Sequence, residues 1–95
     1  MAYHVIFSGD ATDDFDRIAD YIAQDSPVRA ISFINELQRR TMDTLGAFPL
    51  GGSKHKGTTL FLSLSGYIVL YEVDYAAKTV SVLRIVSGKT DWKKP

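Results

Sequence analysis

The sequence predicts a single α+β domain, in which a helical hairpin packs on one face of an antiparallel sheet in the order strand, helix, helix, strand, strand, strand. Apolar residues recur every three or four positions in the first half of the chain, as in amphipathic helices. They recur at every second position in the last third, as in strands. The 95 residues are close to the usual size of a domain with one core, so we expect residues 1–95 to form one unit.

The chain is expected to open with a short strand and a helix. Tyr3 to Phe7 is rich in aromatic and β-branched residues, and the following Ser8, Gly9 and Asp10 favour a turn and a helix cap. From Ala11 onward the apolar residues fall on one helical face, which consists of Phe15, Ile18, Ala19 and Ile22. We interpret the aspartates of this helix as its solvated face.

A second helix should follow after a very short link. Ser26 can cap it, and Pro27 suits its first position, where a missing N–H costs nothing. Its apolar stripe consists of Ala30, Phe33, Ile34, Leu37, Thr41 and Leu45. The helix should end between Gly46 and Pro49, because proline disfavours helical geometry in the residue before it. The short link predicts an antiparallel helical hairpin.

The rest of the chain is predicted to be one loop and a meander of three strands. Pro49–Gly57 is rich in glycine and lysine and has no apolar period, so we expect a loop. Strands are expected at Thr59–Ser65, Tyr67–Asp74 and Thr79–Ser87, with a tight turn at Ser65-Gly66. The middle strand is apolar on both faces and should be central and covered on both sides.

Composition excludes several classes of site. There is no cysteine, so disulfides, thiolate metal sites and cysteine nucleophiles are ruled out, which fits a reducing compartment such as the cytoplasm. We find neither a signal-peptide pattern nor an apolar run near the roughly 20 residues that span a bilayer, so no membrane association is expected. Without clustered metal-ligand spacing or a phosphate-binding glycine loop, we expect no metal and no cofactor.

Charge is unevenly distributed, although the formal net charge is zero. Aspartates crowd the first third, and lysines and arginines dominate the rest. Lys54, His55 and Lys56 form a basic segment that either contacts phosphate or an acidic surface or is simply solvated. His55 has no carboxylate or nucleophile beside it in the sequence that would make it a general base. Arg84 lies in an apolar strand, so it either pairs with the helix acids or contacts a binding partner.

The C-terminal tail contains Lys89, Asp91, Trp92, Lys93 and Lys94. Trp92 either caps the core or, as a tryptophan beside lysines, anchors an interface, and we favour the interface. The two tyrosines of the middle strand, Tyr67 and Tyr71, are interpreted as core residues and not as a ligand platform.

Several fragments, taken in order, resemble the RelE/ParE superfamily of toxins from bacterial toxin–antitoxin modules. They are the acidic first helix with a proline-opened second helix, LGAFPLGG at 45–52, GYIVLYEVD at 66–74 and VLRIVSGKTDW at 82–92. The resemblance extends over nearly the whole chain. It implies a toxin that a cognate antitoxin keeps silent by covering a groove or sheet edge, and it leaves a homodimer or a heterotetramer with antitoxin open.

The resemblance also bears on mechanism. Where the RNA-cleaving, RelE-like branch carries arginines, this chain has Ile68 and Thr90, and no tyrosine follows Thr90 to act as acid or base. Enzymatic activity is therefore not expected, and no catalytic residue is assigned. The chain resembles the ParE-like branch better, although Ser87 stands where many of its members have histidine.

The ParE-like branch is associated with inhibition of DNA gyrase by binding, so gyrase is the expected target. The expected target-binding residues are Lys54, Lys56, Arg84, Lys89, Trp92 and Lys93. Two alternatives stay open: a ribosome-dependent mRNA endoribonuclease of the RelE type, and a regulatory binder that has the toxin fold without toxicity.

Overall fold

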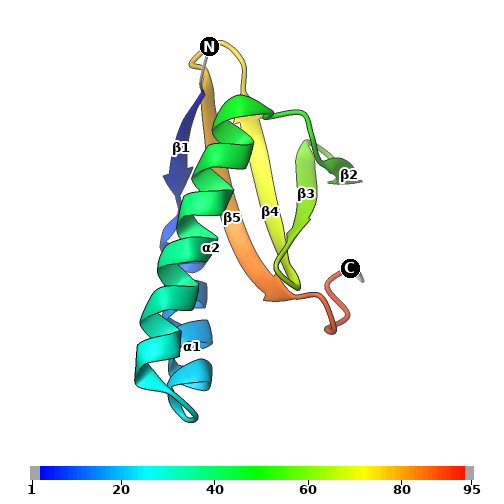
Figure 1. Ribbon diagram of the computed structural model, residues 1–95. Coiled ribbons are helices and arrows are strands. Elements are labelled where there is room, and N and C mark those ends of the chain that lie inside the picture. Colours follow the sequence, from blue (N-terminus) through cyan, green and yellow to red (C-terminus); the bar gives the residue numbers. More distant parts are fainter. Residues whose placement is uncertain (1–2, 94–95) are drawn as a thin grey trace.

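The computed structural model describes residues 3–93, which form two helices on one face of a five-stranded mixed sheet (Figure 1). The elements in chain order are β1 (His4–Phe7), α1 (Gly9–Ala23), α2 (Pro27–Ala47), β2 (Ser53–Lys56), β3 (Thr59–Leu64), β4 (Tyr67–Asp74) and β5 (Thr79–Ser87). The predicted α+β class and the helical hairpin are confirmed. The hairpin extends beyond the end of the sheet at the α1–α2 link (Figure 1).

Both helices begin at the serines that the sequence indicates. The Ser8 hydroxyl accepts a hydrogen bond from the Ala11 amide at 3.1 Å, and the Ser26 hydroxyl accepts one from the Arg29 amide at 3.2 Å. Pro27 lies in the first turn of α2, where its missing N–H leaves no helical bond unmade. Neither helix in residues 3–93 combines the length and the apolar character that crossing a bilayer would require.

The sheet has the strand order β1-β5-β4-β3-β2, and the expectation of a purely antiparallel sheet is wrong at one pair. β1 runs parallel to β5, with His4 opposite Thr79 and Phe7 opposite Val82. The other neighbouring strands are antiparallel. Alternation of apolar residues is the same in parallel and antiparallel strands, so the sequence pattern could not decide this pairing.

The expected loop at Pro49–Gly57 is wrong in its second half, where Ser53–Lys56 forms the edge strand β2. β2 pairs with β3 and contains a register shift between Lys54 and Lys56. An edge strand needs only one partner and little burial, so its polar side chains carry no apolar alternation that the sequence could reveal. Short, lysine-bearing edge strands also discourage pairing with other chains.

The core lies between the helical hairpin and the sheet. The predicted apolar stripe of α2 is confirmed, because Ala30, Leu37, Thr41 and Leu45 are buried. The Thr41 hydroxyl donates to the Leu37 carbonyl at 2.7 Å, so this buried polar group is satisfied. β4 is the central strand. Its consecutive residues Ile68 and Val69 point to opposite faces of the sheet, and both are buried.

The turn between β3 and β4 is as tight as predicted. Leu64 lies opposite Tyr67, so Ser65 and Gly66 alone make the connection. Both have positive φ, 54° and 85°, which matches the right-handed twist of a two-residue hairpin.

Tyr71 fixes the chain where it enters β2. Its side chain is fully buried, and its hydroxyl accepts a hydrogen bond from the Gly52 amide at 2.9 Å. Burial raises the pKa of the Tyr71 phenol, and the bond from Gly52 opposes that rise. A Cβ at Gly52 would lie 2.5 Å from this hydroxyl and closer still to the Phe61 carbonyl. Only glycine fits here without movement of the backbone.

We therefore expect Gly52→Ala to lower the free energy of unfolding by about 2 kcal/mol, because the added methyl must displace backbone and break the bond to Tyr71. Urea unfolding measures the change. Gly9→Ala is the matched control, since a Cβ at Gly9 meets nothing within 4 Å. Equal stability of the two variants would contradict the close packing at Gly52.

Candidate functional site

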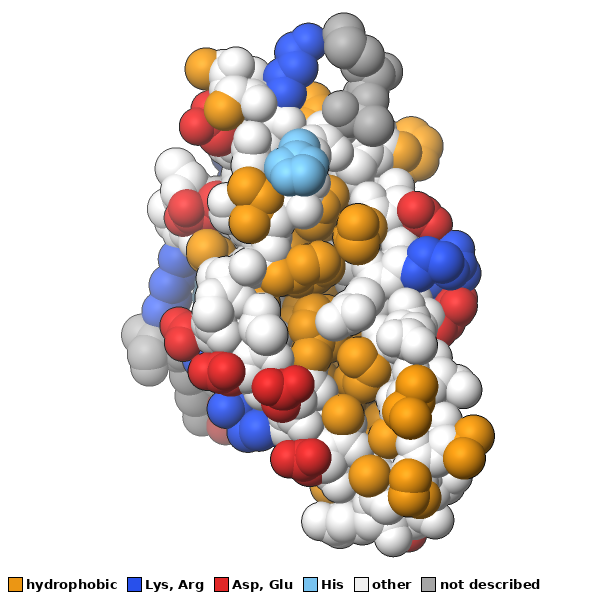
Figure 2. Space-filling view, turned by 90° about the vertical axis from the view of Figure 1, so that its left-hand side faces the viewer, with side chains coloured by type: hydrophobic (Ala, Val, Ile, Leu, Met, Phe, Trp, Pro, Cys, Tyr) orange, Lys and Arg blue, Asp and Glu red, His pale blue; other side chains and the backbone are white. Residues whose placement is uncertain are grey.

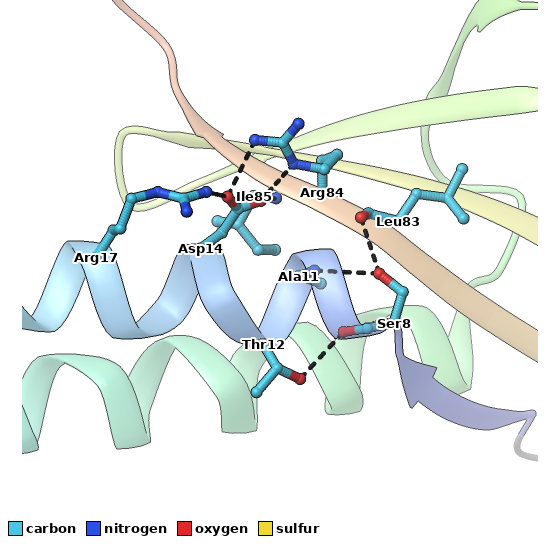
Figure 3. A network of polar contacts seen from close by, with 8 residues as sticks. All are labelled: Ser8, Ala11, Thr12, Asp14, Arg17, Leu83, Arg84 and Ile85. Carbon is cyan, nitrogen blue, oxygen red and sulfur yellow. Dashed lines mark hydrogen bonds and ion pairs between the residues drawn. The ribbon is translucent and has the colours of Figure 1, made fainter.

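A buried carboxylate joins α1 to β5. The Asp14 side chain is 3% exposed, and its Oδ2 accepts hydrogen bonds from Arg84 Nε and from the Ile85 amide, each at 2.8 Å (Figure 3). Its Oδ1 accepts from Arg84 Nη2 at 3.1 Å and also from Arg17. The pairing of Arg84 with Asp14 is thus bidentate, the strongest arrangement for these groups.

The carboxylate is needed because β1 is shorter than its partner. β1 pairs with residues 79–82 only, and beyond them α1 contacts β5, with Asp14 bonded to the Ile85 amide. At this edge the Ser8 amide donates to the Val82 carbonyl and the Ser8 hydroxyl to the Leu83 carbonyl, both at 2.9 Å (Figure 3). Together with Asp14, Ser8 satisfies backbone groups that would otherwise lack partners.

The environment of Asp14 affects its pKa in two opposing ways. Burial raises the pKa of the carboxyl group, but the hydrogen bonds from Arg84 and Ile85 and the charges of Arg84 and Arg17 outweigh burial and lower it from 3.8. The same hydrogen bond raises the pKa of Arg84. Asp14 is therefore an ionised structural group and not a proton donor at neutral pH, and the expectation that all aspartates of α1 are solvated is wrong for Asp14.

A groove lies between α1 and the end of β5, and we call it the α1–β5 groove. Its volume is about 600 Å³, and the Ser65-Gly66 turn forms part of its lining. Its residues from α1 are Asp14, Arg17, Ile18 and Tyr21, and those from the sheet and tail include Tyr67, Arg84–Ser87, Lys89 and Thr90. Apolar side chains and three cations therefore line the same concavity.

A second group of side chains, the aromatic cluster, consists of His55, Phe61, Trp92 and Lys93. The Phe61 and Trp92 rings are 4.6 Å apart between centroids, and His55 lies 5.5 Å from Trp92. Lys93 Nζ lies 5.4 Å from the Trp92 centroid and 5.9 Å from that of Phe61, within reach of cation–π attraction. Phe61 is opposite Leu70, so the cluster lies on the sheet face that alternates with the core-facing Val69 and Tyr71.

A third surface, formed by the helices and β1, is apolar with an acidic border. Viewed from this side, an apolar band runs down the middle of the molecule, and acidic side chains gather along its lower left (Figure 2). The large apolar side chains exposed on these elements are Ile6, Tyr21, Val28, Ile31 and Met42. An apolar surface of this kind is typical of a protein–protein interface.

Comparison with known proteins decides the family. A family model described as "ParE toxin of type II toxin-antitoxin system, parDE" matches residues 5–92. The chain belongs to the ParE toxin family. No curated protein matches this ParE-family toxin at a significant level.

Solved structures share the fold of this ParE-family toxin. A chain of the chromosomal ParDE toxin–antitoxin system from P. aeruginosa is 18% identical and superposes with a TM-score of 0.76, covering 90% of this chain and 96% of that one. A chain of the RelBE2 toxin–antitoxin complex from Mycobacterium tuberculosis is 22% identical, with a TM-score of 0.71 and coverage of 92% and 99%. The isolated E. coli RelE toxin is 18% identical, with a TM-score of 0.62 and coverage of 96% and 89%.

The structure separates the residues that the sequence analysis assigned to target binding in this ParE-family chain. The β2 register shift places Lys54 opposite Leu60 and Lys56 opposite Thr59, so the two lysines lie on different faces of the sheet. Trp92 and Lys93 belong to the aromatic cluster. Arg84 and Lys89 line the α1–β5 groove, where Asp14 holds Arg84 in an ion pair. Lys94 lies outside the described residues.

Some members of these sites were not predicted. Arg17 lies one helical turn after Asp14, a spacing that suggests pairing but does not reveal a groove. Phe61 alternates with core residues in β3, and only the folded tail shows that it supports Trp92. His55 packs on these rings in the aromatic cluster. Among residues 3–93 no three His, Asp or Glu side chains come together in a way that could hold a metal ion.

We expect Asp14→Asn to lower the free energy of unfolding by about 2 kcal/mol near neutral pH, because it weakens the bonds to Arg84 and the Ile85 amide. The loss should be smaller than for a fully buried pair, since the Arg84 side chain is 46% exposed. Urea unfolding of Asp14→Asn and of the exposed control Asp13→Asn measures it. If Asp13→Asn lowered the free energy of unfolding as much as Asp14→Asn does, the charge of the helix, and not the buried network, would be responsible for the loss.

The pH dependence of stability should also identify Asp14 as a carboxylate whose ionisation stabilises the fold. Because its pKa is lower in the folded protein than the unfolded value of 3.8, its contribution is complete above that pH and is lost as the pH falls through the folded-state pKa. Asp14→Asn should therefore show a flatter decline in unfolding free energy between about pH 5 and pH 2 than the unchanged protein. Parallel curves for the two proteins would show that other carboxylates cause the acid sensitivity.

Proposed function

We propose that this toxin inhibits DNA gyrase by binding it in the cytoplasm, without cleaving any bond, and that a cognate antitoxin neutralises it. The observation that carries the proposal concerns the two positions where RNA-cleaving relatives keep arginines. Ile68 is 6% exposed, and the Thr90 hydroxyl donates to the Ser87 carbonyl at 2.8 Å. Neither side chain can place a positive charge on a phosphate.

The distribution of the other cations also supports binding over chemistry. Cleavage of RNA requires a general base, a general acid and several positive charges that converge on one phosphate. Arg17 and Arg84 are paired with Asp14, and Lys54 and Lys56 lie on different faces of the sheet. His55 packs edge-on to Phe61, at 88° between the ring planes.

The surface best suited to the target is the aromatic cluster with Lys56 beside it. Trp92 is half-buried against Phe61 and His55, so its ring is held in place before binding. Tryptophan and other rigid aromatic residues carry much of the energy of protein interfaces. Lys54, on the other face of β2, and Lys89, in the α1–β5 groove, are placed outside this contact, and Arg84 is assigned mainly to the ion pair with Asp14.

The antitoxin is proposed to bind the helical side of the molecule. The apolar band with its acidic border lies on the side away from β2 and the tail, which leaves the aromatic cluster uncovered (Figures 1 and 2). Chains with this fold occur in solved structures of ParDE and RelBE toxin–antitoxin systems. A toxin–antitoxin heterotetramer is the assembly we favour over a toxin homodimer, since the antitoxin would cover the apolar band.

One observation favours the alternative of a ribosome-dependent endoribonuclease. Aromatic rings packed edge to face beside a lysine form a surface on which RNA bases can also stack. The remaining alternative, a regulatory binder without toxicity, predicts that induced expression leaves growth unchanged.

We expect Trp92→Ala combined with Lys93→Glu to reduce gyrase inhibition at least tenfold, because the pair removes the anchor and its neighbouring charge. A supercoiling assay with purified gyrase measures inhibition, and circular dichroism confirms that the fold is kept. Arg29→Glu, an exposed change at the start of α2, is the control and should inhibit as well as the unchanged toxin.

Sequencing of mRNA ends after induced expression separates the two mechanisms. Unchanged transcripts together with inhibited supercoiling are expected. Codon-positioned cuts with normal supercoiling would replace the gyrase proposal by the endoribonuclease alternative.

A further inference from the structure

We propose that the α1–β5 groove binds a small phosphate monoester that carries an aromatic ring, the chemistry of a nucleoside monophosphate. The phosphate contacts Lys89 and Arg84 at the end of β5, and the ring packs against Tyr21 and Tyr67. The groove shares no described residue with the aromatic cluster, so the site is separate from the surface assigned to gyrase. The proposal therefore does not depend on the identity of the toxin's target.

The charge of the groove matches a doubly charged anion. Its cations are Arg17, Arg84 and Lys89, and its one carboxylate among the described residues is that of Asp14, so three positive charges and one negative charge leave a net charge of +2. Both oxygens of Asp14 are already bonded, and Asp10, which acts on Arg84, is not among the lining residues. A phosphate monoester carries a charge of about −1.5 to −2 at neutral pH, whereas a carboxylate carries a single charge.

The end of β5 presents hydrogen-bond donors that suit an oxyanion. Beyond Val82, no described strand pairs with the edge of β5 that faces α1. The Ile85 amide points away from β4, to Asp14, and the alternation of the ladder turns the Ser87 amide to the same side. The Ser87 hydroxyl accepts a hydrogen bond from the Lys89 amide at 3.2 Å, which leaves its own hydrogen to donate. Ser87 therefore supplies two donors next to the charge of Lys89.

The cations are held in place before a ligand arrives. Asp14 bonds Nε and Nη2 of Arg84, and the third nitrogen, Nη1, has no hydrogen-bond partner among the described residues (Figure 3). The backbone beside Lys89 is fixed because the Gly88 amide donates to the Gly66 carbonyl at 3.1 Å. A site that is formed before binding loses less conformational entropy when the ligand binds. Arg84 Nη1 can therefore donate to a phosphate oxygen without breaking the ion pair with Asp14.

The rest of the groove suits a flat ring. Its volume of about 600 Å³ is in the range of small-molecule sites, and Ile18 and Val86 add apolar surface to its lining. Tyr67 is half-buried and packs against Phe33 with 5.8 Å between ring centroids, so its side chain is held in place. Tyr21 is 72% exposed, and its ring can cover a bound ring from the solvent side. Every nucleobase can stack on such side chains.

A single phosphate group fits the groove better than a nucleic-acid chain does. Binding of a chain relies on unpaired cations that follow its backbone over several nucleotides. Here Arg17 and Arg84 share the Asp14 carboxylate, and within residues 3–93 Lys89 is the one cation of the groove that has no ion pair. The charges of the groove are therefore sufficient for one phosphate and not for a series of them.

The test is titration of the full-length, isotope-labelled toxin with adenosine 5′-monophosphate, followed by amide NMR. The amide signals of Ser87 and Lys89 should shift as the nucleotide saturates the groove. Adenosine and inorganic phosphate, titrated separately, should each bind at least about tenfold more weakly, because each keeps only one half of the contacts.

Two variants separate the phosphate contact from the ring contact. Lys89→Gln should weaken binding of the nucleotide and of inorganic phosphate about tenfold each, because it removes a charge-assisted hydrogen bond. Tyr21→Ala should weaken binding of the nucleotide about tenfold and leave that of inorganic phosphate unchanged. Both side chains are exposed, so the fold should be kept. Arg29→Gln, an exposed change outside the groove, is the control and should alter neither affinity.

The outcomes decide the proposal in the following way. Saturable shifts of the Ser87 and Lys89 amides that weaken in Lys89→Gln and persist in Arg29→Gln would support it. Absence of shifts at millimolar nucleotide, shifts confined to the aromatic cluster, or equal affinities for adenosine and its monophosphate would overturn it. An oligoadenylate without a terminal phosphate that bound the groove as tightly as the monophosphate would also overturn it, because the site would then recognise a nucleic-acid chain.

Discussion

The fold depends on hydrogen-bond partners for the part of β5 that β1 does not pair with. A strand edge inside a protein leaves amides and carbonyls that must find partners, and β1 is too short to supply them. Ser8 and Asp14 of the adjoining segment supply them instead. The carboxylate can be buried only because two arginines balance its charge. This one arrangement fixes the distance and angle of α1, and through α1 the position of the whole hairpin over the core.

The same arrangement divides the surface into regions with different chemistry. The helices present apolar side chains bordered by acids (Figure 2). The opposite face of the sheet presents the rings and the lysine of the aromatic cluster. The α1–β5 groove lies at the boundary between them and contains both apolar groups and cations. A small domain can therefore have more than one partner without one contact covering all the others.

The helices and the central strands could be predicted because burial repeats along them. Phe15, Leu37 and Leu45 fall on the expected stripes, and Tyr71 is in the core as predicted. β2 was missed because a polar edge strand has no apolar period. The parallel direction of β1 was missed because periodicity contains no information about direction.

The site was harder to predict than the fold because it depends on long-range pairing. Arg84 was correctly recognised as needing a partner, and an ion pair with the helix acids was one of two expectations. The sequence does not say which aspartate forms this pair. Asp14 differs from its neighbouring aspartates only in the helical position that it shares with buried residues. Lys54 and Lys56 look like one basic segment until the register shift separates them. Trp92 was expected at an interface, and the residues that support its ring come from two different strands.

The pairing of β1 with β5 also determines when the protein can fold. β1 is the first strand to leave the ribosome, but its neighbour in the sheet, β5, is among the last segments synthesised. His4 therefore cannot pair until Thr79 has been made. The Asp14 carboxylate likewise finds Arg84 only 70 residues later. Contacts between residues so distant along the chain make folding slow, because the entropy of closing the long intervening segment is lost before the contact stabilises the protein. During synthesis, therefore, the helical hairpin emerges without the strand that holds it, and the native toxin forms only when the last strand is free.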